Sequence, residues 1–379
     1  GDLMATLKDL GLDQDTIVVF SSDNGPSVES YLPQDYKPTF FDSYGPFDGI
    51  KRDCWDGGVR VPTILRWSGR VPGGRENAVA SSFADWLPTF ADAAGVPVPA
   101  RSDGVSLLPA LTGQGQQRAA RVYVEYAQNQ KTPQFAQPNH RGRQRNQMQA
   151  IVVGDKVGVR YDIKGADDDF EIYELADTKQ LNNLAKTPGM AEVQAQLKAT
   201  ALRVRRPDPE AKRPYDAAPI PALDVKGEPR PGVAWQAFDG DFPWVPRFDE
   251  MSPAIRGVST RGVAGALPAD DRFGLLITGY LNVPADGRYE LSVVTGGRAI
   301  LRVHEATVID ADRGVRPAEG DPTGSIVLKA GPHPFRLYYV PAGKGKAGKP
   351  GLELFWSGPG IERQPVPASA LTNGGVAEK

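Results

Sequence analysis

Residues 15–26 read Asp15-Thr16-Ile17-Val18-Val19-Phe20-Ser21-Ser22-Asp23-Asn24-Gly25-Pro26, a short β-branched apolar run followed at once by a polar turn. Such a run is typical of a buried parallel strand. It places Asp23 and Asn24 at the carboxyl end of that strand, where open α/β sheets bind their ligands. An adjacent carboxylate and amide suit a hard cation such as Ca²⁺ or Mg²⁺. The alternative is that the segment only makes a turn, because Asp, Asn, Gly and Pro all favour turns.

A second segment, residues 45–62, favours the cation-site interpretation of Asp23 and Asn24 over a plain turn. It runs Gly45-Pro46-Phe47-Asp48-Gly49-Ile50-Lys51-Arg52-Asp53-Cys54-Trp55-Asp56-Gly57-Gly58-Val59-Arg60-Val61-Pro62, before the strand-like run 63–67. The order Ser-Asp-Asn-Gly, lysine, aromatic, acid, Gly-Gly and Arg-Val-Pro resembles the sulfatase family. The resemblance implies that Asp23 and Asn24 are metal ligands for Ca²⁺ and that Lys51 is a catalytic residue contacting the sulfate. Two positions depart from the family pattern, which commonly has glycine at Arg52 and glutamate at Asp56; Arg52 could repack the loop or supply a second cation.

The same resemblance extends over roughly the first 210 residues and predicts an α/β fold. Residues 1–115 are expected to be the C-terminal part of an alkaline-phosphatase-like sulfatase domain, with a helix capped by Asp85 and closed by Gly95. Residues 116–206 are expected to form a small antiparallel subdomain and a terminal helix. The predicted strands and helix are 121–126, 149–153, 156–161, 170–175 and 190–204.

Beyond residue 206 the composition changes. Residues 207–231 are rich in proline and predict a semi-rigid linker. Residues 232–371 carry alternating runs that predict an all-β sandwich and resemble the protective-antigen-type module. The seven runs are 233–238, 272–283, 287–294, 299–303, 324–328, 333–340 and 352–356. The resemblance implies carbohydrate binding or a spacer role; Thr295-Gly296-Gly297-Arg298 replaces the Asp-Asp pair of calcium-dependent sugar binders, and Asp310 and Asp312 are expected to be solvated.

Composition argues against several classes of protein. With 379 residues and a formal net charge of −2, the chain has no basic run of the kind that binds nucleic acid. No stretch approaches the length of a membrane span. The single cysteine, Cys54, rules out an internal disulfide framework, and no histidine lies near it in sequence, so we do not expect a thiolate nucleophile. The Gln/Asn-rich segment 128–149, which carries Arg141, Arg143 and Arg145, is expected to be a solvated or substrate-side loop.

The sulfatase nucleophile is a formylglycine made within a Cys/Ser-x-Pro/Ala-x-Arg motif near the family's N-terminus, and residues 1–231 contain no such motif. The segment Ser252-Pro253-Ala254-Ile255-Arg256, whose proline stands one place early, lies in the predicted β-sandwich. The chain therefore resembles the C-terminal portion of a longer, periplasmic or secreted enzyme and is expected to be inactive alone. The parent would be a calcium-dependent, arylsulfatase-like sulfuric ester hydrolase acting on sulfated glycans. Two alternatives remain open. One is a phosphoesterase or phosphonate hydrolase of the same superfamily, which typically needs histidines for a second metal. The other is a non-catalytic protein that binds a carbohydrate or a partner.

Overall fold

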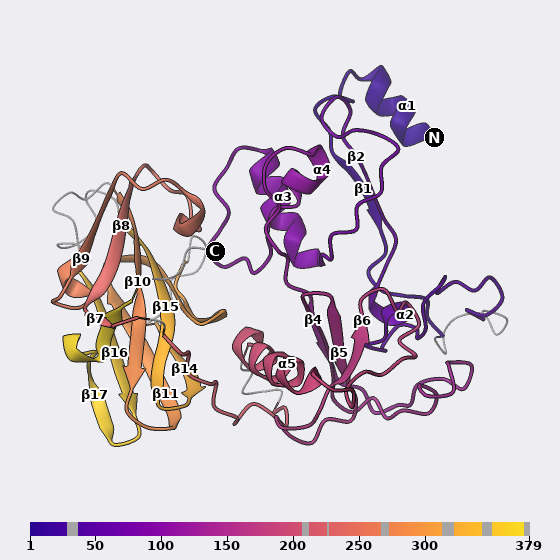
Figure 1. Ribbon diagram of the computed structural model, residues 1–379. Coiled ribbons are helices and arrows are strands. Elements are labelled where there is room, and N and C mark those ends of the chain that lie inside the picture. The colour runs from indigo at the N-terminus through magenta and orange to yellow at the C-terminus, as the bar shows by residue number, and fades with distance from the viewer. Residues whose placement is uncertain are drawn as a thin grey trace. The chain divides into compact units, whose positions relative to one another are not determined.

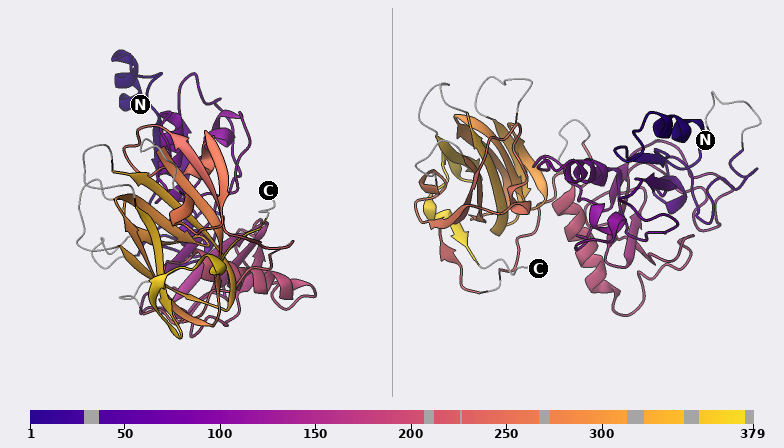
Figure 2. Two further views of the ribbon diagram at one scale, coloured as in Figure 1. Left: turned by 90° about the vertical axis from the view of Figure 1, so that its left-hand side faces the viewer. Right: turned by 90° about the horizontal axis from the view of Figure 1, so that it is seen from above.

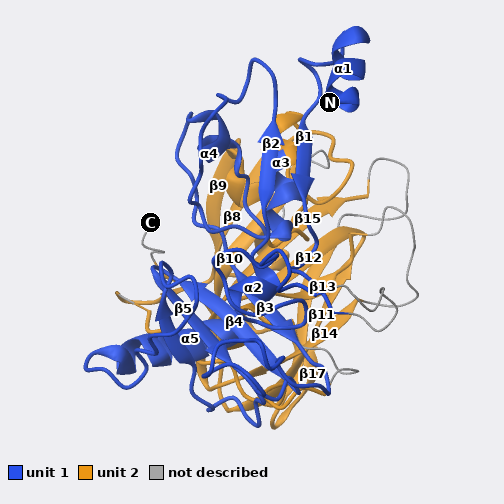
Figure 3. Cartoon of the chain, turned by 90° about the vertical axis from the view of Figure 1, so that its right-hand side faces the viewer, with its two compact units in different colours: residues 1–89, 104–201 blue, residues 90–103, 202–379 orange. Residues whose placement is uncertain are grey.

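The computed structural model describes residues 1–28, 37–206, 212–225, 227–266, 273–312, 322–342 and 351–374. The chain forms two compact units, which Figure 3 colours separately. Unit 1 consists of residues 1–89 and 104–201, and unit 2 of residues 90–103 and 202–379. Segment 90–103 therefore groups with the C-terminal unit, although the sequence places it within the predicted α/β domain.

Unit 1 begins with a helix and a two-stranded ribbon (Figure 1). Its first elements are α1 (Asp2–Asp9), β1 (Val18–Ser21), α2 (Asp56–Val59) and β2 (Thr63–Arg66). The prediction of a buried parallel strand was wrong, because β1 pairs antiparallel with β2. Phe20 and Ile64 lie opposite each other in this ribbon and are 65% and 64% exposed. An apolar run predicts a strand from its composition, whereas the strand's direction depends on which segment pairs with it.

The helix predicted near residue 85 is present, but its cap differs from the prediction. The 3₁₀ turn η1 (Phe83–Asp85) leads into α3 (Trp86–Ala93), and α4 (Leu108–Thr112) follows later. Ser82 is the N-cap residue, and Asp85 closes a capping box by accepting a hydrogen bond from the Ser82 backbone N–H at 2.6 Å. Gly95, with φ of 67°, takes the left-handed conformation expected after the helix.

A four-stranded antiparallel sheet completes unit 1, as the sequence predicted. Its strands run in the order β3-β4-β5-β6, and α5 (Met190–Val204) follows them in the chain. The strand bounds are Tyr123–Tyr126, Met148–Val153, Lys156–Arg160 and Glu171–Glu174. Gly158 in β5 leaves room for α5, since a Cβ there would lie 2.8 Å from a methyl carbon of Leu197.

Unit 2 is an antiparallel β-sandwich (Figure 2). One sheet has the order β13-β12-β15-β10-β18-β7, with β8 paired to β10 and β9 paired to β8; the other has the order β14-β11-β16-β17. All seven predicted runs form strands. The strand bounds are Arg230–Pro231 (β7), Val233–Asp239 (β8), Ile255–Ser259 (β9), Phe273–Val283 (β10), Gly287–Thr295 (β11), Gly297–Val303 (β12), Ala306–Asp310 (β13), Thr323–Leu328 (β14), Gly331–Pro341 (β15), Leu352–Gly358 (β16), Ile361–Pro365 (β17) and Leu371–Asn373 (β18). The 3₁₀ turns η2 to η4 are Phe248–Glu250, Ala264–Ala266 and Ala368–Ala370.

The segment predicted to be a linker contacts the sandwich in its described part. Tyr215 and Ile220 are buried, and Ile220 forms a bridge to Leu328 at the end of β14. Asp216 pairs with the buried Arg205 at 3.1 Å. Proline content predicted an extended segment, but its few apolar residues are enough to attach it to the sheet. Among the described residues of both units, no helix has the length and apolar character needed to cross a bilayer.

Candidate functional site

The turn that follows β1 presents oxygen atoms at its surface. Asp23 is exposed and Asn24 is half-buried. The Ser22 hydroxyl donates to the Asn24 carbonyl oxygen at 2.9 Å, and the Asn24 side-chain nitrogen donates to the Gly25 carbonyl oxygen at 2.8 Å. Because this second bond uses the amide nitrogen, the Asn24 side-chain oxygen remains the atom suited to a cation. The two residues thus offer a carboxylate and an amide oxygen, a donor set that fits Ca²⁺.

Two backbone hydrogen bonds join this turn to residues 48–58, which we call the Lys51 loop. The Lys51 N–H donates to the Pro26 carbonyl oxygen at 2.8 Å, and the Gly25 N–H donates to the Gly58 carbonyl oxygen at 3.0 Å. The approach is so close that a Cβ on Gly25 would lie 1.8 Å from the Gly57 carbonyl oxygen. Glycine is therefore required at position 25, and the sequence-predicted residues Asp23, Asn24 and Lys51 sit on two segments in direct backbone contact.

The Lys51 loop has unusual backbone geometry next to the lysine. Arg52 has φ of 74°, in the left-handed region that disfavours residues with a Cβ. This position is one of the two at which the sequence departs from the sulfatase pattern, where glycine is common. The geometry explains the family's glycine, because glycine adopts this φ without the steric cost. In this chain the arginine is held in the same conformation.

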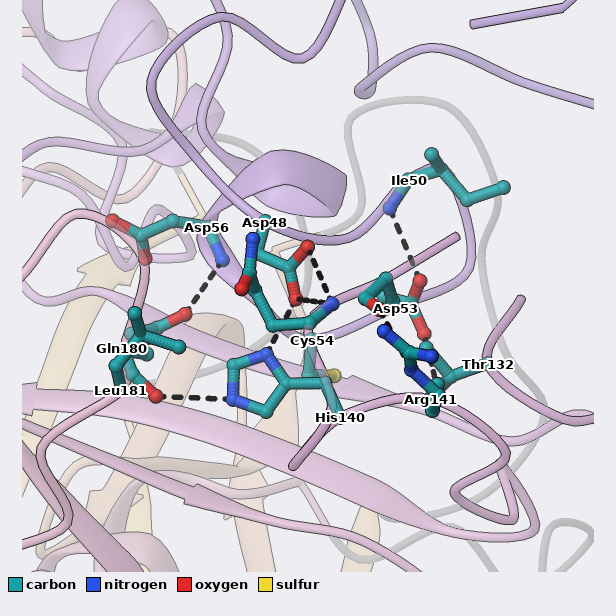
Figure 4. A network of polar contacts seen from close by, with 12 residues as sticks. Asp48, Ile50, Asp53, Cys54, Asp56, Thr132, His140, Arg141, Gln180 and Leu181 are labelled. Carbon is teal, nitrogen blue, oxygen red and sulfur yellow. Dashed lines mark hydrogen bonds and ion pairs between the residues drawn. The ribbon is translucent and has the colours of Figure 1, made fainter. Parts of the chain in front are cut away.

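Asp48 anchors the start of the Lys51 loop (Figure 4). Its carboxylate lies 2.5 Å from the His140 ring nitrogen Nδ1 and accepts the Gln137 N–H at 3.2 Å. The other ring nitrogen of His140, Nε2, lies 3.0 Å from the Gln180 carbonyl oxygen. The His140 ring is therefore held between two oxygen atoms, one on the Asp48 carboxylate and one on the Gln180 backbone. His140 is fully buried, so this pair is a structural anchor inside unit 1.

Asp53 anchors the end of the same loop through a second buried pair. The Arg145 guanidinium donates to both oxygens of the Asp53 carboxylate, each at 2.7 Å. The exposed fractions of the two side chains are 4% for Arg145 and 0% for Asp53. The carboxylate also accepts from the Thr132 hydroxyl and the Ile50 N–H, each at 3.0 Å. Lys51 therefore lies between two internally paired carboxylates, which fix the loop's backbone.

An aromatic stack lies beneath the loop. Trp55 stacks on His140 with ring centroids 3.8 Å apart, and on Tyr161 at 4.8 Å. The Tyr161 hydroxyl accepts the Cys54 N–H at 2.8 Å. Cys54 is 1% exposed, and burial raises the pKa of its thiol well above the usual range. A buried thiol with a raised pKa is poorly suited to act as a nucleophile.

Sequence reasoning missed these anchors and misjudged one segment. Residues 128–149 were predicted to be a solvated or substrate-side loop, but they contribute the buried His140 and Arg145. Arg143 also turns inward, pairing with Glu171 at 2.6 Å and lying over the Trp55 ring. The acids at positions 48 and 53, three residues before and two residues after Lys51, were the only local signal, and their partners are 92 residues away. Within the described residues, no three His, Cys, Asp or Glu side chains meet to hold a metal.

Comparison with known proteins finds matches to both parts of the chain. Residues 1–96 match the family model for sulfatases, and residues 229–370 match the model for the PA14 domain. Mouse steryl-sulfatase is 40% identical over 128 residues, which is 33% of this chain and 20% of that protein. Human arylsulfatase A is 38% identical over 120 residues, 30% of this chain and 21% of that protein. A solved structure of a protein in complex with its substrate D-glucosamine-2-N,6-O-disulfate is 27% identical, with a TM-score of 0.38, over 53% of this chain and 36% of that one.

The fold and the matches define a two-part chain, an α/β segment followed by an antiparallel β-sandwich. The first part matches the sulfatase family model over residues 1–96, and the second matches the PA14 model over residues 229–370. The chain spans about a fifth of the length of the curated relatives it matches.

Proposed function

We propose that unit 1 contributes to the active site of a calcium-dependent sulfatase that hydrolyses sulfate esters of glycans. The observation that carries the proposal is the pair of backbone hydrogen bonds between the turn at Asp23 and Asn24 and the Lys51 loop. These bonds bring two oxygen ligands and one ammonium group onto adjacent segments. The names of the relatives support the reaction class, and one of them, N-acetylgalactosamine-6-sulfatase of the dog, supports a sulfated sugar as substrate. The family resemblance also motivates a periplasmic or secreted location.

In this proposal each residue has a distinct role. Asp23 and Asn24 hold Ca²⁺ through oxygen, and the bound cation supplies positive charge that orients the sulfate group. Lys51 places its ammonium against a sulfate oxygen, where it stabilises the negative charge that grows during cleavage. The Asp48–His140 and Asp53–Arg145 pairs keep the backbone of Lys51 in place, so that its side chain is the part that adapts to the substrate.

The covalent step needs a nucleophile that these residues do not supply. Cys54 is buried, and burial raises the pKa of its thiol, so the proposal assigns that role to a formylglycine outside this chain. We therefore expect the chain by itself to show no turnover of a chromogenic aryl sulfate. Turnover by this chain that Lys51→Ala abolishes would contradict both the missing nucleophile and the division of roles.

Two substitutions test the roles in a protein that carries the nucleophile motif. Asp23→Ala should lower both bound calcium and activity, because it removes a charged ligand from a site of about 6–8 oxygens. Lys51→Ala should leave calcium content unchanged and lower turnover by about 100-fold, equivalent to about 3 kcal/mol of charge stabilisation. The measurements are metal content by elemental analysis and kcat on an aryl sulfate. Equal calcium loss in both variants would refute the assignment.

The alternatives give different results in the same assays. A phosphoesterase or phosphonate hydrolase would cleave an aryl phosphate or phosphonate faster than the matching sulfate, and would hold a second metal ion. A non-catalytic binding protein would bind a sulfated glycan without turnover even when the upstream coding sequence is present. A Cys/Ser-x-Pro/Ala-x-Arg motif in that upstream sequence, together with sulfate turnover, supports the sulfatase proposal over both.

A further inference from the structure

A short segment that precedes α4 is built into the β-sandwich unit. Residues 97–103, Pro97-Val98-Pro99-Ala100-Arg101-Ser102-Asp103, which we call the strap, belong to unit 2, whereas residues on both sides, up to 89 and from 104, belong to unit 1. The PA14 family model starts only at residue 229. The strap is therefore an addition to the sandwich from a distant part of the sequence.

The strap pairs with residues 244–247 through its backbone. The Ala100 N–H donates to the Val245 carbonyl oxygen at 2.9 Å, and the Arg247 N–H donates to the Val98 carbonyl oxygen at 2.7 Å. Pro99 and Pro246 form an antiparallel bridge between these two bonds. The Trp244 indole N–H also donates to the Pro97 carbonyl oxygen at 3.0 Å. An extended Pro-x-Pro segment read by backbone bonds and an indole N–H is a typical mode of peptide recognition.

Arg302 of β12 binds the next part of the strap. Its guanidinium donates to the carbonyl oxygens of Ala100 and Ser102, at 2.8 and 2.9 Å. It also donates to the Asp103 carboxylate at 2.8 Å. Arg302 is 5% exposed, and its bonds to the two carbonyl oxygens form away from bulk water. Arg247 donates to the Ser102 carbonyl oxygen as well.

Two side chains of the strap contact residues of matching character in the sandwich, one apolar and one acidic. Ala100 is 1% exposed and lies in a buried apolar cluster with Phe238, Phe242, Val245, Phe248, Leu276, Ile300, Tyr338 and Val340. The next residue, Arg101, pairs with Asp310 at 3.0 Å and donates to the Asp312 carbonyl oxygen. Asp312 itself is buried and accepts the Val245 N–H at 2.9 Å. The expectation of a solvated side chain was wrong for Asp312, which is buried, whereas Asp310 is exposed as expected and pairs with Arg101 at the surface.

We propose that this face of the sandwich is a recognition site for an extended peptide of the pattern Pro-x-Pro-Ala-Arg-x-Asp, and that the strap occupies it as an intramolecular ligand. The site reads the peptide backbone through residues 244–247 and Arg302, requires a small residue in the apolar cluster, and selects a basic and then an acidic side chain through Asp310 and Arg302. This inference is independent of the proposed sulfatase activity.

The test uses the full chain and a fluorescently labelled synthetic peptide of residues 96–104. Ala100→Glu in the chain puts a charge into the apolar cluster and should expel the strap. Fluorescence anisotropy should then show saturable peptide binding to this variant, with much weaker binding to the unmodified chain, because the tethered strap competes at high effective concentration. Adding Arg302→Ala should weaken binding by about 10- to 100-fold, since it removes charge-assisted bonds. Arg288→Ala, which removes a bond to Ser325 on the other sheet, is the matched control and should change nothing.

Several results would overturn the proposal. The proposal fails if the peptide binds the unmodified chain and the Ala100→Glu variant equally. It also fails if Arg302→Ala does not weaken binding, or if a folded Ala100→Glu variant binds no peptide. If Ala100→Glu prevents folding, hydrogen exchange in the unmodified chain and in Arg302→Ala decides. The Ala100 and Arg247 amides should be protected in the former and should lose protection selectively in the latter, while amides of β10 and β15 keep theirs. Unprotected strap amides in the unmodified chain, or unselective loss, would refute the site.

Discussion

The buried pair between Asp53 and Arg145 should control the stability of the Lys51 loop. Arg145→Met keeps the volume of the side chain but leaves the Asp53 carboxylate, 0% exposed, without its cation. The Thr132 hydroxyl and the Ile50 N–H would remain as neutral donors, each at 3.0 Å. Breaking one partner of a buried ion pair costs about 3–5 kcal/mol. We expect a loss of this size in the free energy of opening the loop.

Cys54 provides a direct assay, because it is the only cysteine in the chain, is buried, and follows Asp53. A thiol reagent can react with it only when the loop opens, so under native conditions the labelling rate follows the opening equilibrium. Arg145→Met should accelerate labelling by two to three orders of magnitude or more, which corresponds to about 3–5 kcal/mol. Arg141→Met, in the same segment but exposed, should change the rate by about twofold at most.

A double substitution separates the ion pair from simple packing. Asp53→Asn combined with Arg145→Met removes both charges, so it should cost less than the sum of the two single substitutions by about 2 kcal/mol. The reasoning is refuted if Arg145→Met accelerates Cys54 labelling less than about fivefold, or if the two single costs simply add.

Three further predictions concern the same chain. Gly25→Ala should cost more than about 2 kcal/mol and should also accelerate Cys54 labelling, because the new Cβ would lie 1.8 Å from the Gly57 carbonyl oxygen; an unchanged rate would contradict the close approach. Arg52→Gly should relieve about 1 kcal/mol of backbone strain at φ of 74° and raise the urea midpoint; a lowered midpoint would show that contacts of the arginine outweigh the strain. Burial and the neighbouring His333 lower the pKa of His304 to about 3, below its value in the unfolded chain, so its contribution to stability is complete above about pH 6.5 and declines as the pH falls. From pH 6.5 to 5 the sandwich should lose about 2 kcal/mol, measured by chemical denaturation, and His304→Asn, which tolerates the positive φ of this residue, should flatten that dependence.

Local patterns in the sequence predicted the elements well. The seven strand runs of the sandwich, the four strands of unit 1 and the helix Met190–Val204 all depend on short-range periodicity, and all are present. The direction of β1 was not predictable in the same way, because nothing in the run itself specifies its partner. Proline content predicted a semi-rigid linker but gave no sign that two of its side chains, Tyr215 and Ile220, are buried.

The buried polar contacts, such as Asp53 with Arg145, could not be predicted from the sequence for a different reason. Arg145 lies in a Gln/Asn-rich segment whose composition indicates solvent, and only the fold reveals that it faces Asp53, 92 residues earlier. The contact between Arg302 and the strap spans 202 residues. A charged side chain looks the same in a sequence whether water or a buried opposite charge neutralises it, so long-range ion pairs carry no local signature.

The stack of Trp55 on His140 gives the Lys51 loop an optical property. The two rings are 3.8 Å apart and nearly parallel, and a histidine ring in stacking contact can quench an excited indole. Trp55 should therefore emit weakly while the loop is closed, and brighten when the rings separate. The loop that holds the proposed sulfate-binding lysine thus contains its own fluorophore. Because the chain has six tryptophans, the signal of the loop is the difference in emission between the unmodified protein and a Trp55→Phe variant.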